Sequence, residues 1–519
     1  MELNGTWRAA VADEALRRTF AQPETDDASW DAVAVPGDWP SADGPLLYRH
    51  RFSAPAPEHG RSWLVFDGIR QQGDVWLDGA YLGDTEGPFA RHTFEITDAL
   101  GAGPDHVLAV DVVGEARPDG RGGIWRGVRI EHTGPVRARS WRILCREASE
   151  DRAVVALRAE LDSDVARTVE VRTVVAGHPD VSEFPVAKGS NFVEWTVTVP
   201  APQRWWPHAL GDQPLHDVGV EVLVDGATSH ALHRRVGLRT IAMRNGIDTI
   251  NGERLFLKGV RGTSVAHARD AGFDLVRLDG IAAEETYDAA DELGMLVWQD
   301  FQPPGTRKQA GRQASAAVDL LGHHPSVAVW FPGRAVRRAI DKADATRPVV
   351  TSRWPHVEDP VPLARAVPRF VRFVADLNGG PDVRTRIETL RRIKYRPTGG
   401  FCLDGPIELD VVDACRPVIV TADPLSPVVA AGDTLAIDVH VVSDLRAPVT
   451  GARVDAVLGW TGGSHDWHWE GDIPADACVL VATLQAVVPD EPGELVLELT
   501  LHAGEHVATN AERAVIVAE

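Results

Sequence analysis

The chain has 519 residues, 44% of them apolar and 25% charged, and it carries a formal net charge of −22 at pH 7. This composition is ordinary for a globular protein, and the length suits about three or four domains of ~150 residues each. Nucleic acids and anionic membrane surfaces attract basic proteins, so neither is expected as a partner. No stretch has the roughly 18 consecutive apolar residues of a membrane span. The N-terminal residues also lack the pattern of a secretory signal, so we expect a cytoplasmic protein.

The cysteines and the short catalytic motifs exclude several kinds of site. The four cysteines, Cys145, Cys402, Cys415 and Cys478, are far apart and contain no Cys-x-x-Cys pair. Neither a zinc site nor a disulfide framework is therefore expected. The patterns of metalloproteases, serine hydrolases and phosphate-binding loops are absent as well. We expect no cofactor and no metal.

The first two segments of the chain are predicted to be all-β. In residues 1–136, short alternating strands such as SWLVFDG (62–68) and GDVWLDGAYLG (73–83) are separated by Gly, Pro and Asp turns. Asp78-Gly79 is typical of a tight hairpin. Residues 137–234 continue with strands and no clear helix, which favours an immunoglobulin-like β-sandwich.

The third segment, residues 235–415, alternates strands with helices such as 283–294, which predicts a parallel β/α sheet. The strand candidates are 255–260, 273–279, 295–301, 327–331, 349–353, 370–376 and 399–404. A (β/α)₈ barrel typically takes ~250 residues and rarely fewer than ~200, so this segment predicts a shortened, TIM-like barrel. Residues 416–519 return to alternating strands and predict a second immunoglobulin-like sandwich.

Short motifs along the whole chain resemble glycoside hydrolase family 2, with some similarity to its β-mannosidase branch. They are LNGTW (3–7), VPGDW (35–39), YRHRF (48–52), VWLDGAYLG (75–83), GIWRGV (123–128), RWWPHALGDQPLH (204–216), INGERLFLKGV (250–260), ELGMLVWQDF (292–301) and KYRPTGGFC (394–402). The resemblance implies that residues 1–136 form a jelly-roll, galactose-binding-like domain. It also implies a carbohydrate or glycoside partner, and it leaves association between copies of the chain open.

The two motifs that carry catalysis in this family are present without their glutamates. HHPSVAVWFPGRA (323–335) resembles the fourth barrel strand, which ends in Gly-Asn-Glu in the family, and it has Ala335 at the position of the general acid/base. PRFVRF (368–373) resembles Pro-Arg-Phe-Val-Ser-Glu and has Phe373 at the nucleophile position. A retaining glycosidase needs two carboxyl groups roughly 5–5.5 Å apart, and neither alanine nor phenylalanine can supply one.

Ligands of parallel barrels meet side chains at the carboxyl ends of strands, and the candidates there follow from that rule. The ligand-binding candidates are Arg277, Trp298, Asp300, Arg334, Trp354 and Arg372. The carboxylates that could replace the lost pair are Asp300, Asp376 and Asp404. Each candidate also has a structural interpretation: an internal salt bridge for Arg277, an acceptor of backbone N–H groups for Asp300, and core packing for the tryptophans.

Arg334 and Arg372 stand beside the lost carboxylates and could make the pocket selective for an anionic ligand. Alternatively, they pair with Glu358, Asp376 or Asp404. Three functions remain open at this point. The chain could be a catalytically degenerate glycosidase that binds carbohydrate or acts as a scaffold. It could be a β-mannosidase-like hydrolase with relocated carboxylates, or a structural subunit that binds a protein.

Overall fold

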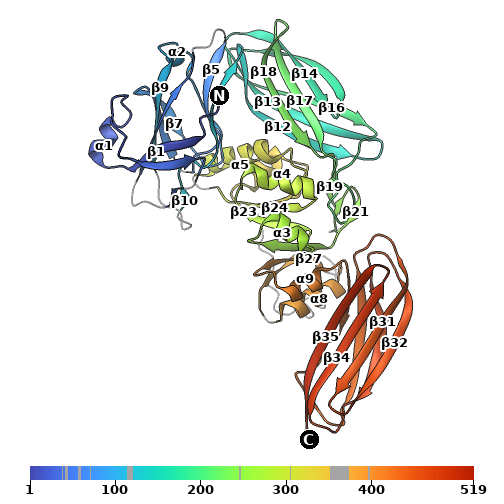
Figure 1. The fold of residues 1–519 in the computed structure, drawn as a ribbon. Coiled ribbons are helices and arrows are strands. Elements are labelled where there is room, and N and C mark those ends of the chain that lie inside the picture. Colours follow the sequence, from blue (N-terminus) through green and yellow to red (C-terminus); the bar gives the residue numbers. More distant parts are fainter. Residues whose placement is uncertain are drawn as a thin grey trace.

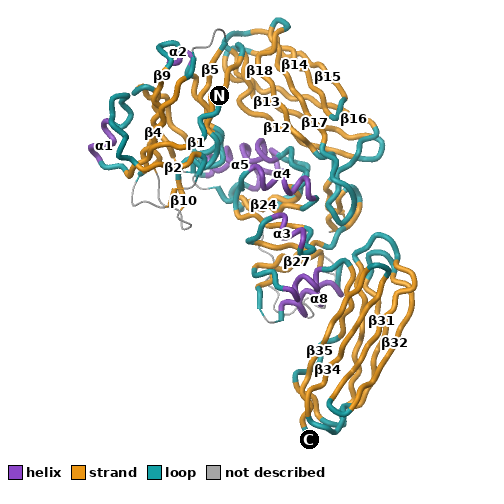
Figure 2. The backbone as a smooth tube through the Cα atoms, in the orientation of Figure 1, coloured by secondary structure: helices purple, strands orange, loops and turns teal. Residues whose placement is uncertain are grey.

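The computed structural model describes the whole chain except residues 38, 41–44, 56–59, 71, 114–120, 245–246, 304–305, 351–372, 381, 396–397 and 519. Four regions follow one another along it, and the last projects away from the other three (Figure 1). The helices lie mainly around the central parallel strands, and strands dominate elsewhere (Figure 2). Within the described ranges, no helix is long and apolar enough to cross a membrane.

The N-terminal region packs a six-stranded sheet against a three-stranded one. The large sheet has the order β2 (Asp31–Val35), β1 (Gly5–Val11), β4 (Leu46–Ser53), β9 (Asp105–Val113), β6 (Gln72–Leu77), β7 (Ala80–Thr85). The small sheet has the order β11 (Val128–Thr133), β5 (Arg61–Phe66), β8 (His92–Glu95). The remaining elements are α1 (Glu14–Thr19), α2 (Thr97–Leu100), and the short pair β3 (Trp39–Pro40) and β10 (Arg121–Gly122). The predicted hairpin is confirmed, because Asp78 and Gly79 join β6 to β7 with φ values of 52° and 82°.

The second region is a sandwich of three and four antiparallel strands around a valine-rich core. One sheet has the order β12 (Val136–Ala148), β13 (Arg152–Ser163), β16 (Gly189–Pro200). The other has the order β15 (His178–Val186), β14 (Arg167–Val175), β17 (His216–Val224), β18 (Ala227–Val236). A small sheet of β19 (Ile241–Arg244), β20 (Ile247–Ile250) and β21 (Glu253–Arg254) leads into the third region.

Six parallel strands form the sheet of the third region. Their order is β25 (Val327–Pro332), β24 (Leu296–Phe301), β23 (Leu275–Asp279), β22 (Leu257–Arg261), β27 (Thr398–Asp404), β26 (Phe373–Asn378). The accompanying helices are α3 (Val265–Asp270), α4 (Glu284–Leu293), α5 (Arg307–Leu321), α6 (Arg337–Ala343), α8 (Val383–Arg392) and α9 (Leu409–Cys415). Trp330 also bridges in parallel to Val349, where a further strand was predicted. Five of the six other predicted strands are confirmed, and the sixth, over 370–376, overlaps β26 from Phe373 onward, while residues 370–372 lie outside the described residues. Barrel closure stays a prediction.

Both faces of this parallel sheet are apolar, as expected for strands that are covered on both sides. Val276, Val297 and Trp330 belong to the large core that includes the helices. Leu275, Trp298 and Phe331 belong to a second cluster on the opposite face. The alternation along each strand sends successive side chains to opposite faces, so charged groups gather at the strand ends.

The C-terminal region is a second sandwich. One sheet has the order β28 (Val418–Ala422), β30 (Thr434–Ser443), β33 (Cys478–Val487). The other has the order β29 (Val428–Ala430), β35 (His506–Val517), β34 (Gly493–Ala503), β31 (Val449–Trp460), β32 (Gly463–Ile473).

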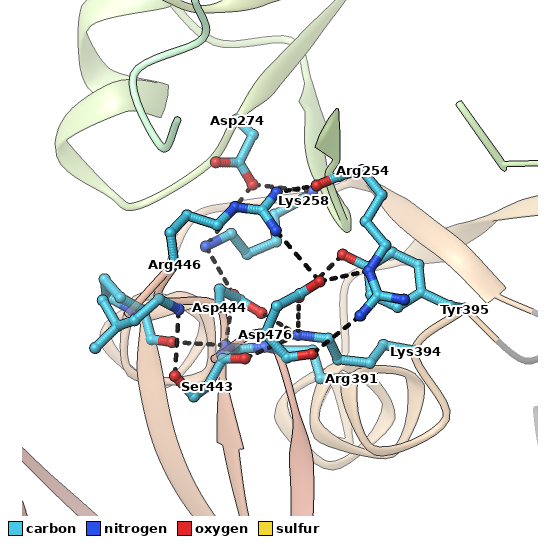
Figure 3. A network of polar contacts seen from close by, with 12 residues as sticks. Arg254, Lys258, Asp274, Arg391, Lys394, Tyr395, Ser443, Asp444, Arg446 and Asp476 are labelled. Atoms are coloured by element: carbon cyan, nitrogen blue, oxygen red, sulfur yellow. Dashed lines mark hydrogen bonds and ion pairs between the residues drawn. The ribbon is translucent and has the colours of Figure 1, made fainter. Parts of the chain in front are cut away.

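Two aspartates of the C-terminal sandwich hold it to the parallel-sheet region (Figure 3). Asp444 lies 2.7 Å from Arg391, 3.1 Å from Lys394 and 3.4 Å from Lys258. Burial alone would raise the pKa of Asp444, but these three cations together hold that pKa well below its ordinary value. Asp476 makes a parallel set of contacts, including one of 2.7 Å to Lys394.

We expect Asp444→Asn to lower the free energy of unfolding by roughly 3–5 kcal/mol at neutral pH, because it leaves three buried cations without their shared carboxylate. Asp423→Asn is the matched control. This change breaks the ion pair between Asp423 and Arg392, in which the Asp423 side chain is 45% exposed. We therefore expect the free energy of unfolding to fall by only about 0–1 kcal/mol. Calorimetric unfolding of both variants measures the difference.

The wild-type protein and Asp444→Asn can also be compared as a function of pH, and the direction of the expected change is defined. The pKa of Asp444 is lower in the folded protein than in the unfolded chain, so the stabilisation that its charge provides is complete above the unfolded pKa of about 3.9. That stabilisation is lost as the pH falls through the folded pKa. The difference in melting temperature between the wild-type protein and Asp444→Asn should therefore shrink in acid. A difference that stays constant or grows in acid would contradict this account.

Candidate functional site at the carboxyl edge of the parallel sheet

Charged side chains end four neighbouring strands of the parallel sheet. Arg261 ends β22, Asp279 ends β23, and Asp404 ends β27, while Asp300 is the penultimate residue of β24. The register sets Arg261 opposite Arg277, and Asp279 opposite Asp300. Because parallel strands share one carboxyl edge, these residues meet where ligands of β/α proteins usually bind.

Arg261 joins two of the carboxylates. Its Nε donates to Asp279 Oδ2 at 2.7 Å, and its Nη1 donates to Asp404 Oδ2 at 3.0 Å. Two carboxylates on one guanidinium group are separated by less than the roughly 9.5 Å that is the widest spacing of a glycosidase pair. Both are engaged in ion pairs, however, and their side chains are 50% and 60% exposed. Asp404 was a predicted candidate, whereas Asp279 was missed, although it ends a predicted strand.

Arg277 and Asp300 form a second, more buried pair. Arg277 donates from Nη2 and Nε to Asp300 Oδ2 at 2.9 and 3.2 Å, and its guanidinium carbon lies 5.3 Å from the centre of the Phe331 ring. Asp300 Oδ1 is buried and has no hydrogen-bond partner among the described residues. Burial raises the pKa of Asp300, and Arg277 opposes that rise. Asp300 thus combines a raised pKa with a free acceptor atom.

Trp298 lies on the same face of the sheet as Asp300, but it is only 5% exposed and therefore offers little surface to a ligand. Its ring packs against Phe331 with a centroid distance of 5.8 Å. Its neighbour Gln299 is structural, because it accepts a hydrogen bond from Tyr287 at 2.6 Å and donates to the carbonyl of Gly280 at 2.8 Å. The core interpretation of Trp298 therefore agrees with its surroundings better than a stacking surface does.

Arg334 and Ala335 lie in the turn between β25 and α6, just beyond the carboxyl end of β25. Both are exposed. Arg334 makes no ion pair with any other described residue. The fourth-strand motif therefore ends at the edge where the family's acid/base would stand, with a methyl group at that position.

Strand β26 sets the position of the second motif. Phe373 is its first residue and pairs with Thr398, whereas Asp376 pairs with Cys402 and Asn378 with Asp404. Phe373 therefore starts the strand at the end opposite the carboxyl edge, and Asp376 is three residues closer to that edge. Trp354 and Arg372 lie outside the described residues.

Comparisons with known proteins place this architecture. Residues 21–118 match the family model described as glycosyl hydrolase 2 galactose-binding domain-like, and residues 137–239 match that of glycosyl hydrolases family 2. Over these two segments the chain carries domains of glycoside hydrolase family 2. The resemblance of the sequence motifs is thereby confirmed.

Two curated relatives are similar over about half of this chain. A β-mannosidase B from Aspergillus terreus is 27% identical over 366 residues, covering 54% of this chain and 42% of the relative. An exo-β-D-glucosaminidase from Streptomyces avermitilis is 28% identical over 306 residues, covering 49% of this chain and 33% of the relative. The chain thus matches about two fifths or less of the length of these relatives.

Solved structures resemble the fold over nearly the whole chain. The β-D-mannosidase from Dictyoglomus thermophilum has a TM-score of 0.79 at 15% identity, covering 99% of this chain and 89% of that one. The exo-chitosanase from Amycolatopsis orientalis has a TM-score of 0.81 at 17% identity, covering 99% and 84%. At such identities the likeness concerns the fold alone.

We expect Arg277→Gln to raise the pKa of Asp300 further, because the guanidinium opposes the effect of burial. The variant should lose roughly 1–3 kcal/mol of stability at pH 7, the usual cost of an unsatisfied buried polar group. A raised folded pKa means that the folded state holds the proton more tightly, so mild acid should restore part of the loss.

The double variant Arg277→Gln/Asp300→Asn removes the charge as well as its partner. It should therefore be more stable at pH 7 than Arg277→Gln alone, and its melting temperature should depend less on pH. Melting curves of the wild-type protein, of Arg277→Gln, of Asp300→Asn and of the double variant complete a double-mutant cycle. Strictly additive losses would show that the two side chains are not coupled.

Proposed function

We propose that this protein binds a glycoside at the carboxyl edge of its parallel sheet and does not hydrolyse it by the family's two-glutamate route. The observation that carries the proposal is Ala335, which follows β25 at that edge and has no group that can transfer a proton. The names of its relatives, β-mannosidase and exo-β-D-glucosaminidase, suggest a β-mannoside or β-glucosaminide as the ligand class. The protein would then be a catalytically degenerate member of a family of carbohydrate metabolism.

The carboxylates at the edge support binding better than catalysis. Asp279 and Asp404 share Arg261, and Asp300 is paired with Arg277. A carboxylate that is paired can still accept hydrogen bonds from sugar hydroxyls, since each carboxylate has about four acceptor sites. Asp279 and Asp404, whose side chains are 50% and 60% exposed, offer such sites to a ligand.

The proposed architecture is a shortened barrel between a jelly-roll and two immunoglobulin-like sandwiches. Support comes from the run of six parallel strands, from the bridge between Trp330 and Val349, and from the similarity of the whole chain to solved family folds. The predicted preference for an anionic ligand depends on Arg334 and Arg372. Arg334 is exposed and unpaired among the described residues, which is compatible with that preference.

A second candidate function, hydrolysis by relocated carboxylates, is favoured by the position of β26. The sequence FVRFVAD (370–376) contains Phe-Val twice, and the second copy lies in β26. If this copy is aligned with the family's Phe-Val-Ser-Glu, Asp376 takes the place of the nucleophile. Asp300, with its raised pKa, would then be the acid.

We expect no turnover of aryl β-mannosides or aryl β-glucosaminides by the purified protein. The assay should include Asp300→Asn, Asp376→Asn and Asp404→Asn, since each removes one carboxylate and keeps the side-chain shape. Turnover that one of these changes abolishes would overturn the proposal and establish the second candidate. Turnover that survives all three changes would contradict both candidates.

We expect methyl β-mannoside or methyl β-glucosaminide to bind, and Asp404→Asn to weaken binding by about 1 kcal/mol, the difference between a charged and a neutral hydrogen bond. Asp423→Asn, whose carboxylate pairs with Arg392 at the C-terminal junction, is the control and should bind normally. Calorimetry with glucuronate as a third ligand tests the role of Arg334. A loss on Arg334→Gln that is confined to glucuronate would support the anionic preference, whereas no binding of any sugar would contradict the proposal.

A further inference from the structure

A cavity of about 520 Å³ lies where the first three regions of the chain meet. The N-terminal region contributes Phe89 and Arg91, the first sandwich contributes Trp141 and Arg234, and α5 contributes Leu320. Its volume is typical of small-molecule sites, which range over roughly 300–1,000 Å³. It is separate from the proposed glycoside site, because none of the charged residues at the carboxyl edge lines it.

Six arginines line the cavity, and five of them are already paired with carboxylates. The pairs are Arg91–Asp67 (2.8 Å), Arg126–Glu284 (3.5 Å), Arg139–Asp162 (2.5 Å), Arg158–Glu194 (3.5 Å) and Arg312–Glu86 (2.9 Å). The sixth, Arg234, has no ion pair in the part of the chain that the structure describes. Its hydrogen bond there goes from Nη1 to the backbone carbonyl of His233 at 2.9 Å.

The surroundings of Arg234 disfavour its charge. Burial lowers the pKa of Arg234, and Glu284, the first carboxylate that opposes this effect, lies beyond ion-pair distance and binds Arg126 instead. Arginine nevertheless remains protonated in proteins. A cation that is partly desolvated and lacks a counter-ion is costly, and an anion in the cavity would remove much of that cost.

The rest of the cavity wall combines aromatic side chains with polar ones, among them the carboxylates of Asp67, Glu160, Glu284 and Asp319. Three of these carboxylates are paired with arginines, and Glu160 accepts a hydrogen bond from Ser190 at 2.6 Å. Phe89 and Trp141 are 8% and 9% exposed, and Phe192 carries Arg158 over its ring at 4.4 Å. A ligand that fits both features has an anionic group for the guanidinium and a flat apolar body for the aromatic wall. Arginine recognises carboxylate and phosphate groups through paired hydrogen bonds.

We propose that this cavity binds a small organic anion whose phosphate or carboxylate group contacts Arg234 and whose apolar part lies against Phe89 and Trp141. The ligand would touch all three surrounding regions, so its binding should also stabilise their arrangement. This inference does not depend on the proposed glycoside site.

Phenyl phosphate is the probe, with inorganic phosphate and phenol as its two halves. Calorimetric titration of the full chain should show phenyl phosphate binding more tightly than either half. Arg234→Met should weaken that binding about tenfold or more, the loss of a hydrogen bond to a charged group. Arg235→Met is the matched control, because the next arginine on β18 is 44% exposed and pairs with Glu292 at 2.8 Å.

Melting temperature provides the second measurement. Phenyl phosphate should raise it in the wild-type protein and in Arg235→Met, but not in Arg234→Met. Without ligand, Arg234→Met should be at least as stable as the wild-type protein, because it removes an unpaired charge. An Arg234→Met protein that is destabilised or unfolded would show a structural role and overturn the proposal.

Three further results would also overturn it. These are the absence of any binding of both phenyl phosphate and benzoate at tens of millimolar, equal binding of the anion to Arg234→Met, and equally tight binding of phenol. Binding of a carboxylate such as benzoate in place of phenyl phosphate would preserve the proposal and identify the preferred anion.

Discussion

The parallel sheet has two apolar faces, and this constraint determines where the charges of the protein can lie. A charge on either face would be desolvated, so charged groups are placed near the ends of the strands or, like Arg277 within β23, in an ion pair. β22 shows both outcomes within five residues. Lys258 near its start reaches Asp444 of the C-terminal sandwich, and Arg261 at its end binds Asp279 and Asp404. One strand thus supports the attachment of a domain at one edge and the candidate site at the other.

Several arginines of this acidic chain connect distant segments by donating hydrogen bonds to their backbone carbonyls. Arg239 is buried and donates to the carbonyls of Pro325 and Val327 at 3.0 and 2.9 Å, which ties the end of the first sandwich to the start of β25. Arg347 donates to the carbonyl of Val327 as well, at 2.6 Å. The guanidinium group presents five donors in a fixed plane, so a single side chain satisfies several carbonyls that no strand partner reaches. Arg234 stands apart from this pattern because, among the described residues, it donates to one backbone carbonyl and has no carboxylate within ion-pair distance.

Much of the fold could be predicted from the sequence, because apolar runs bounded by turn residues define strands locally. The hairpin at Asp78 and Gly79 and the strand over 295–301 are examples of this local information. An internal salt bridge was one of the two interpretations of Arg277, but its partner Asp300 was interpreted as an acceptor of backbone N–H groups instead. The register of β26 could not be predicted, because FVRFVAD repeats Phe-Val and periodicity cannot choose between the copies. Arg234 could not be singled out either, since its lack of a partner depends on three regions that meet only in the folded chain.

Arg261 has a consequence for which ligands the edge can accept. Its two carboxylates come from β23 and β27, the strands on either side of β22, so the group acts as a staple across three strands. These carboxylates are held beside Arg261 by the chain itself, so their effective concentration is high. An anion from solution would have to displace them to bind the guanidinium group. A neutral polyol meets no such competition, because it can add hydrogen bonds to the oxygens that the arginine leaves free. The staple therefore gives an anionic sugar no advantage at Arg261, so a preference for anions at this edge would have to come from Arg334.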